Sequence, residues 1–301
     1  MRALAAFALA GSLLLAGCAA PEPSAQDQDL IGGRHAGADD APATVLLANG
    51  CSAAQVGPGV LLTAAHCVYS ASRGRVSSAF DDGAKLQLRY AAGQASVDVV
   101  VGTTLINQAW QLACAVSYCG PSEVTGKLDA ADVALILLDE HPADIPIAPI
   151  DTAALAIGDS IVLAGYGCEQ GLRKPDERED TTLALADSRV VDAAEVVHEG
   201  SFMGEADVDV MRGSYFVSLG PGADADAAGL CPGDSGGPVY RRAGEKLTVV
   251  GVNANYTLGP EQDDPIGLPV TNWHTRLDAN SRHDIAGWLA ENGALLSGEE
   301  N

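Results

Sequence analysis

One glycine-rich segment, Gly229-Leu-Cys-Pro-Gly-Asp-Ser-Gly-Gly-Pro238, restricts this chain more than any other stretch. It places Ser235 between glycines, with Asp234 directly before it. Because glycine tolerates backbone conformations that other residues rarely adopt, the segment can form a tight, exposed turn. We expect the backbone amides of Gly233 and Ser235 to converge on one point, where they can stabilise an oxyanion.

A serine hydroxyl is a weak nucleophile, so it needs a base that is oriented by a third group. The stretch Thr63-Ala-Ala-His66-Cys67 supplies an imidazole. Further along, Asp132 opens the apolar run Val-Ala-Leu-Ile136, which is suited to a buried strand. The sequence therefore offers a candidate nucleophile, Ser235, a candidate base, His66, and a candidate orienting acid, Asp132.

The motifs T-A-A-H-C, D-V-A-L and G-D-S-G-G-P, in this order, resemble those of the chymotrypsin/trypsin family of serine endopeptidases. The resemblance covers nearly all of the chain after its first 29 residues. It implies an all-β fold of two six-stranded antiparallel Greek-key barrels with a C-terminal helix that packs on the second barrel. It also implies peptide-bond cleavage through an acyl-enzyme on Ser235, with His66 as general base and acid, Asp132 as orienting acid, and no metal or cofactor.

The same resemblance sets the expected domain boundaries. The protease domain is expected over residues 30–292 of the sequence. Within it we expect a first barrel at 30–145, a second barrel at 150–280, a terminal helix at 281–292 and, after the domain, a tail at 293–301.

Three other functions stay open. Gly233-Asp-Ser-Gly-Gly237 also fits the G-x-S-x-G elbow of α/β-hydrolases, although in those enzymes the histidine follows the serine. His274 and His283 do follow Ser235, but no repeated strand–helix units precede it. The other two alternatives keep the protease scaffold: a non-catalytic binding module, and an esterase that uses the same three residues.

By resemblance, the residue six positions before the serine forms the floor of the primary specificity pocket, and here it is Gly229. A neutral floor favours small or apolar uncharged side chains before the scissile bond over arginine or lysine. Asp224 and Asp226 in the adjacent loop favour the alternative, since carboxylates attract basic residues over a distance. The later wall of the pocket is expected to consist of Asn253, Ala254, Asn255 and Tyr256.

Leu30-Ile-Gly-Gly33 resembles the family sequence that becomes the new amino terminus when a propeptide is removed. In that case the α-ammonium of Leu30 would pair with Asp234 and order the oxyanion loop. The family usually carries Arg or Lys before the cut, whereas this chain carries Asp29. The sequence therefore does not define the activating protease.

Cysteine usage indicates an exported protein. The chain has seven cysteines, and setting Cys18 aside leaves an even number for disulfides. The resemblance implies a bridge across the histidine strand, and two further pairs follow among the remaining residues, although other pairings stay open. The expected disulfides are Cys51–Cys67, Cys114–Cys119 and Cys168–Cys231.

Residues 1–18 have the character of an export signal, because Arg2 precedes an apolar stretch too short to span a membrane. The ending Leu-Ala-Gly-Cys18 resembles the bacterial lipobox, which implies a lipid on Cys18; an ordinary signal peptide is the alternative. Residues 19–29 read as a solvated tether. We expect an outer-membrane-anchored lipoprotein that a cut before Leu30 releases into the periplasm or medium.

The formal charge is −23, from 40 acidic and 17 basic residues. This charge argues against binding nucleic acid or an anionic membrane through a basic face. The expected partners are protein or peptide substrates, the expected state is a monomer, and the only membrane contact is through a lipid on Cys18. Asp81 and Asp82 lie where some relatives have a calcium loop, but we interpret them as a turn.

Overall fold

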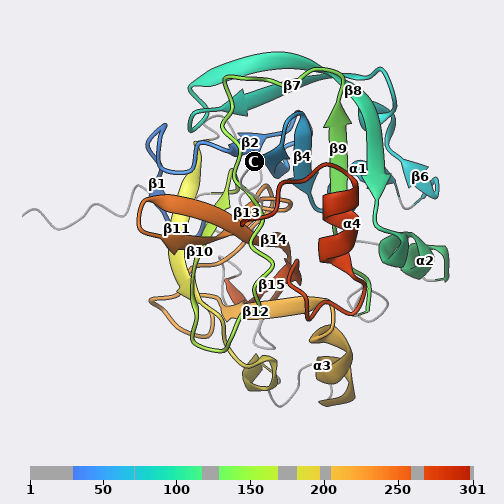
Figure 1. The fold of residues 1–301 in the computed structure, drawn as a ribbon. Helices are drawn as coiled ribbons and strands as arrows, with labels where there is room; N and C mark the ends of the chain where they lie inside the picture. The colour runs from blue at the N-terminus through green and yellow to red at the C-terminus, as the bar shows by residue number, and fades with distance from the viewer. Residues whose placement is uncertain are drawn as a thin grey trace, which may run out of the picture.

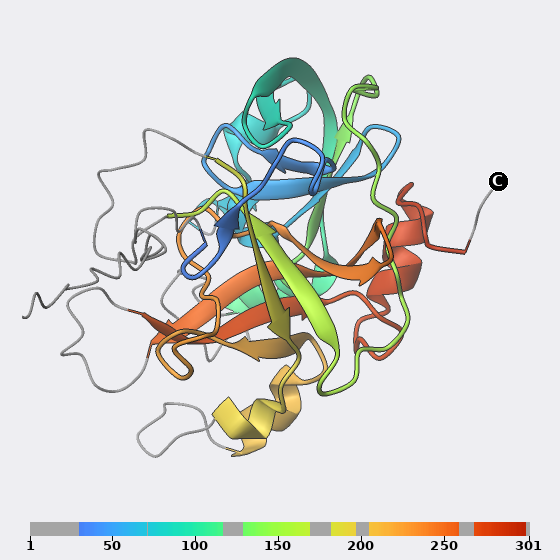
Figure 2. The ribbon, with the colours of Figure 1, turned by 90° about the vertical axis from the view of Figure 1, so that its left-hand side faces the viewer.

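The computed structural model describes residues 30–70, 72–116, 129–168, 182–196, 205–258 and 268–298. These residues form two antiparallel β units, one above the other in Figures 1 and 2, with short helices at their edges. The prediction of an all-β fold with a C-terminal helix is confirmed. Cys18, the tether 19–29 and Cys119 lie outside the described residues.

The first unit is a closed barrel of six antiparallel strands in the order β2-β3-β4-β9-β8-β7. Alternation of buried and exposed residues in β7 puts Leu86 and Leu88 into its core, as a half-buried strand requires. A turn at Pro58 and Gly59 separates β3 from β4, because proline has no amide to donate and Gly59 adopts a φ of +71°. The strands are β2 (Thr44–Leu46), β3 (Ser52–Gly57), β4 (Val60–Thr63), β7 (Lys85–Tyr90), β8 (Ala95–Ile106) and β9 (Ala134–Leu138).

The second unit is a seven-stranded antiparallel sheet in the order β1-β11-β10-β13-β14-β15-β12. It differs from a six-stranded barrel because the short β1 pairs with part of β11, while a single bridge between Val191 and Val217 brings the two ends of the sheet together. The strands are β1 (Arg34–His35), β10 (Ser160–Gly165), β11 (Ala184–Arg189), β12 (Tyr215–Leu219), β13 (Pro238–Ala243), β14 (Lys246–Leu258) and β15 (Pro269–Arg276).

Small elements decorate both units. A two-stranded ribbon joins β5 (Tyr69–Ser70) to β6 (Arg75–Val76). The helical elements are α1 (Ala65–Val68), η1 (Ser78–Phe80), α2 (Gln108–Val116), η2 (Ala193–Val196), α3 (Glu205–Met211) and α4 (Ile285–Glu291). Within the part of the chain that is described, no helix combines the length and apolar character needed to cross a membrane.

Contrary to the sequence prediction, the terminal helix α4 does not pack on the second barrel. Its buried residues, Ile285 and Leu289, pack into the large cluster that fills the first barrel and its contact with the second unit, and not into the separate core of the second sheet. After the helix, the amide of Leu295 donates to the carbonyl of Val56 in β3. Helix α4 therefore ties the end of the chain back to the first barrel, beside β9 and α1 in Figure 1.

Buried polar contacts fix the two units against each other. The hydroxyls of Thr44 in β2 and Tyr240 in β13 lie 2.8 Å apart, and both residues are fully buried. The amide of Tyr166 donates to Ser52 Oγ across the same contact at 2.9 Å. Since buried polar groups are costly unless paired, these bonds favour one relative orientation of the two units.

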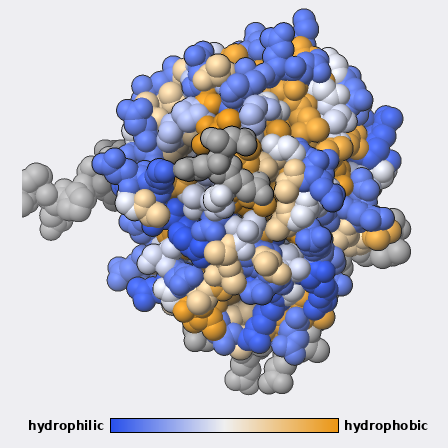
Figure 3. All heavy atoms as spheres, in the orientation of Figure 1, coloured by the Kyte–Doolittle hydropathy of each residue, from blue (hydrophilic) through white to orange (hydrophobic). Residues whose placement is uncertain are grey.

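The surface is mostly hydrophilic, with apolar residues scattered in small patches on the face shown in Figure 3. The large apolar side chains that are exposed in the described residues are Leu112, Ile157, Leu258 and Leu295. Single exposed apolar residues of this kind are normal on a folded protein and do not by themselves mark a binding surface.

Candidate active site

His66 lies on the short helix α1, directly after β4 of the first barrel. A disulfide between Cys51 and Cys67 joins the start of β3 to this helix, with Cα atoms 6.2 Å apart. The bridge fixes the backbone next to the histidine. The side chain of His66 is 30% exposed, so the ring meets solvent on one side.

Asp132 holds this ring from the other side. One carboxylate oxygen of Asp132 lies 2.7 Å from His66 Nδ1, and the other accepts the backbone amide of His66 at 2.9 Å. Asp132 is almost fully buried, at 3% exposure. Because a carboxylate accepts hydrogen bonds, this geometry places a proton on Nδ1 and makes Nε2 the acceptor.

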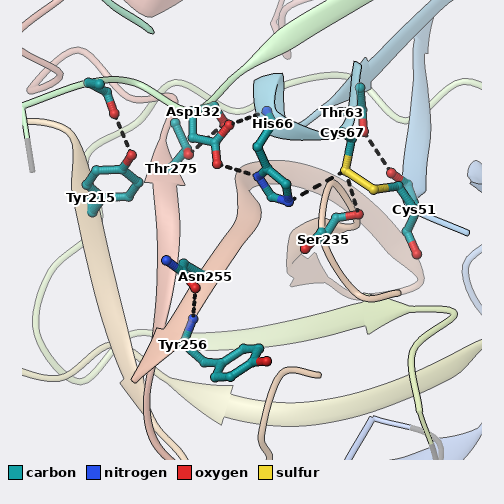
Figure 4. A network of polar contacts seen from close by, with 12 residues as sticks. Cys51, Thr63, His66, Cys67, Asp132, Tyr215, Ser235, Asn255, Tyr256 and Thr275 are labelled. Carbon is teal, nitrogen blue, oxygen red and sulfur yellow. Dashed lines mark hydrogen bonds and ion pairs between the residues drawn. A yellow bond between two sulfur atoms is a disulfide. The ribbon is translucent and has the colours of Figure 1, made fainter. Parts of the chain in front are cut away.

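Ser235 lies on the Nε2 side of the ring, so that the imidazole stands between Asp132 and Ser235 in Figure 4. The Cys67 sulfur is 3.8 Å from His66 Nε2 and 3.6 Å from the carbonyl oxygen of Ser235. That carbonyl also accepts the amide of Ser52 at 2.9 Å, which holds the serine backbone against the first barrel. The Ser235 hydroxyl has no hydrogen-bond partner among the described residues, so no hydrogen bond to them fixes the χ1 angle of this side chain.

The backbone around Ser235 has the tight form that its glycines predict. Gly233 and Gly236 have φ angles of +109° and +81°. A Cβ atom on Gly236 would lie 2.1 Å from Thr63 Oγ1, so only glycine fits there. In the described part of the chain, the amides of Gly233 and Ser235 donate to no protein atom and remain available to a ligand oxygen.

Asp234 turns away from the solvent. Its carboxylate is fully buried and accepts the amides of Gly167 and Cys231, each at 2.9 Å. Burial raises its pKa from 3.8 to about 7, against the opposing effect of these two hydrogen bonds. No cation of the described chain lies within ion-pair distance of it. Asp234 is therefore a buried carboxylate without a compensating charge among the described residues.

Leu30, the first described residue, lies close to this region in the fold. It is fully buried in the core of the second unit, in one cluster with Leu230 and Val239. The next residue, Ile31, forms an antiparallel bridge with Gly229, whose amide donates to the Ile31 carbonyl at 2.8 Å. The segment around Leu30 is thus attached directly to the loop that leads to Ser235.

Gly229 itself has little free space. A Cβ atom there would lie 2.7 Å from Pro221 Cδ and 3.1 Å from Pro269 Cγ. The next amide, that of Leu230, donates to the side chain of Asn272 at 2.8 Å. The floor of the expected pocket is therefore bounded by prolines and a neutral amide.

A continuous chain of neutral polar side chains lies behind this floor. Asn253 donates to Ala164 O, so its oxygen must accept from His274 Nδ1 at 3.0 Å. His274 Nε2 then accepts from Ser218, 3.0 Å away, and Ser218 accepts from Asn272 at 3.1 Å. Burial lowers the pKa of His274 to about 3, so the imidazole is neutral and the network carries no charge.

The other expected wall residues follow Asn253 on β14. Ala254 is buried, and Asn255 uses its side-chain oxygen to accept the amide of Tyr256 at 2.9 Å. Tyr256 is partly buried against the core cluster that contains Leu230. Burial also raises the pKa of its hydroxyl, so the ring presents a neutral surface.

The structure links Cys168 to Cys231, which connects the end of β10 to the loop before Ser235. The expected Cys114–Cys119 pair involves residues outside those whose side chains are described. Within the described residues, the potential metal ligands that cluster are His66, Cys51 and Cys67, and the two sulfurs are already joined as a disulfide.

Several residues that shape the site have no local signal in the sequence. Ser52 donates to the carbonyl of Gly233 at 2.8 Å and so fixes the Gly233–Asp234 peptide from the first barrel. Gly165 and Gly167 leave room for the Asp234 carboxylate, since a Cβ on either would lie within 2.5 Å of it. Such contacts join segments far apart in the chain, so the residues around Ser235 do not predict them.

A comparison with protein families finds one described as Trypsin, which matches residues 30–271. No curated protein sequence matches this chain.

Proposed function

Because the chain belongs to the trypsin family of serine proteases, we propose that it is an endopeptidase in which Ser235, His66 and Asp132 act together. The observation that carries this proposal is the pairing of His66 with Asp132, where one carboxylate binds both the ring and the amide of the histidine. This arrangement holds Nε2 as the acceptor on the side of Ser235, as a general base requires.

The mechanism follows from these positions. His66 Nε2 takes the proton from the Ser235 hydroxyl as its oxygen attacks the peptide carbonyl. The oxyanion of the tetrahedral intermediate binds to the unpartnered amides of Gly233 and Ser235. His66 then gives its proton to the leaving amine, and an acyl-enzyme remains on Ser235. Water attacks this acyl-enzyme while His66 takes a proton from the water, and His66 returns that proton to Ser235 as the product leaves. Asp132 stabilises the imidazolium throughout.

The neutral surroundings of Gly229 support cleavage after small or apolar uncharged residues. The side chains behind the floor form a complete neutral hydrogen-bond network, and no carboxylate lies among them. A basic substrate side chain would find no counter-charge among these described side chains. Protein or peptide substrates and a monomeric enzyme remain part of this proposal.

The mature enzyme begins, in this proposal, at Leu30. Burial of Leu30 beside the loop of Asp234, together with the uncompensated Asp234 carboxylate, supports a cut before Leu30 whose new α-ammonium pairs with Asp234. A lipid on Cys18 would hold the precursor at the outer membrane, and the cut would release the protease into the periplasm or the medium.

The test is covalent labelling with a serine-directed phosphonate probe. We expect a chain that begins at Leu30 to be labelled, and its Ser235→Ala variant to lose both labelling and about 10⁴-fold or more of kcat on a peptide substrate. Ser188→Ala, which removes a serine from β11, is the control and retains both. Labelling that survives in Ser235→Ala would overturn the assignment, and turnover of esters without peptides would favour the esterase.

A further inference from the structure

The backbone that carries Asp132 has no regular secondary structure and lies just before β9. The carbonyl groups of residues 130–133 nevertheless all accept hydrogen bonds. Within the segment, Val133 N donates to Ala131 O at 2.9 Å, and Asn107 N donates to Val133 O at 3.2 Å. The remaining two carbonyls, those of Ala130 and Asp132, accept hydrogen bonds from the second unit.

Both donors come from one cross-strand pair. Tyr215 in β12 and Thr275 in β15 are direct antiparallel partners, so their side chains lie on the same face of the sheet. The Tyr215 hydroxyl donates to Ala130 O, and the Thr275 hydroxyl donates to Asp132 O at 2.9 Å. Figure 4 shows both side chains reaching toward the segment that carries Asp132.

The contact of Tyr215 and Thr275 with residues 130–132 is buried, and the charge of Asp132 acts on Tyr215. Tyr215 and Thr275 are 3% and 0% exposed, and Ala130 is 1% exposed. The pKa of Tyr215 is raised well above its ordinary value, first by burial and then by the negative charge of Asp132. A buried carbonyl that loses its donor is left without a hydrogen bond, which destabilises the folded state. Residues 130–133 would therefore shift, or the folded state would be less stable.

We propose that Tyr215 and Thr275 are positioning residues that orient Asp132 toward His66 from the second unit; this inference rests on the proposed function. His66 and Asp132 both belong to the first barrel, but the strand pair of the second unit fixes the backbone on which the carboxylate stands. Docking of the two units therefore aligns the acid with the base. Loss of the two hydroxyls lets the carboxylate shift, and displacement of a catalytic group by about 1 Å can cost about 10²-fold in rate.

The variant that tests this inference is the double substitution Tyr215→Phe with Thr275→Val, which removes both hydroxyls and keeps the side-chain shapes. We expect kcat to fall by about 10- to 100-fold, with KM unchanged, because neither residue is expected to contact substrate. Thr275→Ser keeps the hydroxyl and should retain most of the activity. Tyr240→Phe is the matched control, because it deletes a buried tyrosine hydroxyl that bonds Thr44 between the same two units.

A purely structural role is separated by a second measurement. If the two hydroxyls act through Asp132, the double substitution should change kcat by less than about 2-fold in an Asp132→Asn background. A full loss of about 10- to 100-fold in that background, or an equal loss in Tyr240→Phe, would refute the inference.

A readout that does not depend on hydrolysis keeps this test distinct from that of the proposed function. In a Ser235→Ala chain, the NMR resonance of the proton between His66 Nδ1 and Asp132 should lie far downfield and vanish with Asp132→Asn. We expect the Tyr215→Phe, Thr275→Val chain to move this resonance upfield, and Tyr240→Phe to leave it in place. An unmoved resonance would refute the positioning role even if the chain hydrolyses nothing, whereas absent turnover in an otherwise unsubstituted chain that begins at Leu30 would refute the proposed function alone.

Discussion

The buried carboxylate of Asp234 makes a quantitative prediction about stability and pH. Burial raises its folded-state pKa from 3.8 to about 7. The folded chain therefore holds a proton on Asp234 between pH about 4 and 7, where the unfolded chain has released it. Since the folded state then binds more protons, the free energy of unfolding decreases as pH rises through this window.

The magnitude follows from the two pKa values. At about 1.4 kcal/mol for each pH unit that separates them, ionisation of Asp234 costs the folded chain about 4 kcal/mol by pH 7. The contribution is absent below pH about 4, where Asp234 is protonated in both states. An α-ammonium on Leu30 would offset this cost by supplying the missing counter-charge, so a chain that begins at Leu30 should lose much less stability over the same range.

Urea unfolding followed by tryptophan fluorescence, with disulfides intact and in a Ser235→Ala background to prevent self-cleavage, provides the measurement. Two chains are compared at about pH 4 and pH 7, one that begins at Ala19 and one at Leu30, each with and without Asp234→Asn. The difference between the chains with and without this substitution isolates Asp234 from the other acids. We expect a loss of about 4 kcal/mol in the longer chain and a much smaller one in the shorter chain.

Two results would contradict this reasoning. Equal losses in both chains would show that Leu30 does not supply a counter-charge to Asp234. Absence of a loss in the longer chain would show that burial does not penalise the carboxylate.

Three other expectations concern the pocket, the second disulfide and the lipid. Gly229→Asp should not create a preference for Arg or Lys in a peptide panel, because its Cβ would lie 2.7 Å from Pro221 Cδ; a strong basic preference would contradict this. Replacing Cys168 and Cys231 by Ala should lower the free energy of unfolding by about 4 kcal/mol, since the bridge closes a sequence separation of 63 residues; an unchanged urea midpoint would refute it. Cys18→Ala should abolish incorporation of a labelled fatty acid in the bacterial host, and continued labelling would place the lipid elsewhere.

Local sequence motifs predicted most residues of the candidate active site. The order of His66, Asp132 and Ser235, each in its own short motif, predicted the protease family that the family comparison shows. The glycines around Ser235 predicted a tight loop, and the positive φ angles of Gly233 and Gly236 account for its shape. These features are visible in the sequence because they depend on neighbouring residues.

Other elements depended on distant parts of the chain. The sequence predicted a C-terminal helix on the second barrel, whereas α4 packs with the core of the first, because amphipathicity does not say which surface a helix covers. In the same way, β1 is a two-residue strand whose pairing with β11 is its only signal, so no pattern in the sequence predicts it. Helices α2 and α3 were also missed, since they span only 9 and 7 residues and such short segments do not distinguish helix from strand.

The sequence by itself determined the family, the residues that carry the proposed chemistry and the glycines that shape the loop of Ser235. Only the tertiary structure decided which hydroxyls hold Asp132, why the surroundings of Gly229 are neutral, and that Asp234 lacks a counter-charge among the described residues. The physical reason is that these properties arise from burial and from bonds between strands far apart in the chain. The residue type determines which hydrogen bonds a side chain can make, but only the packing of the folded chain determines its partners.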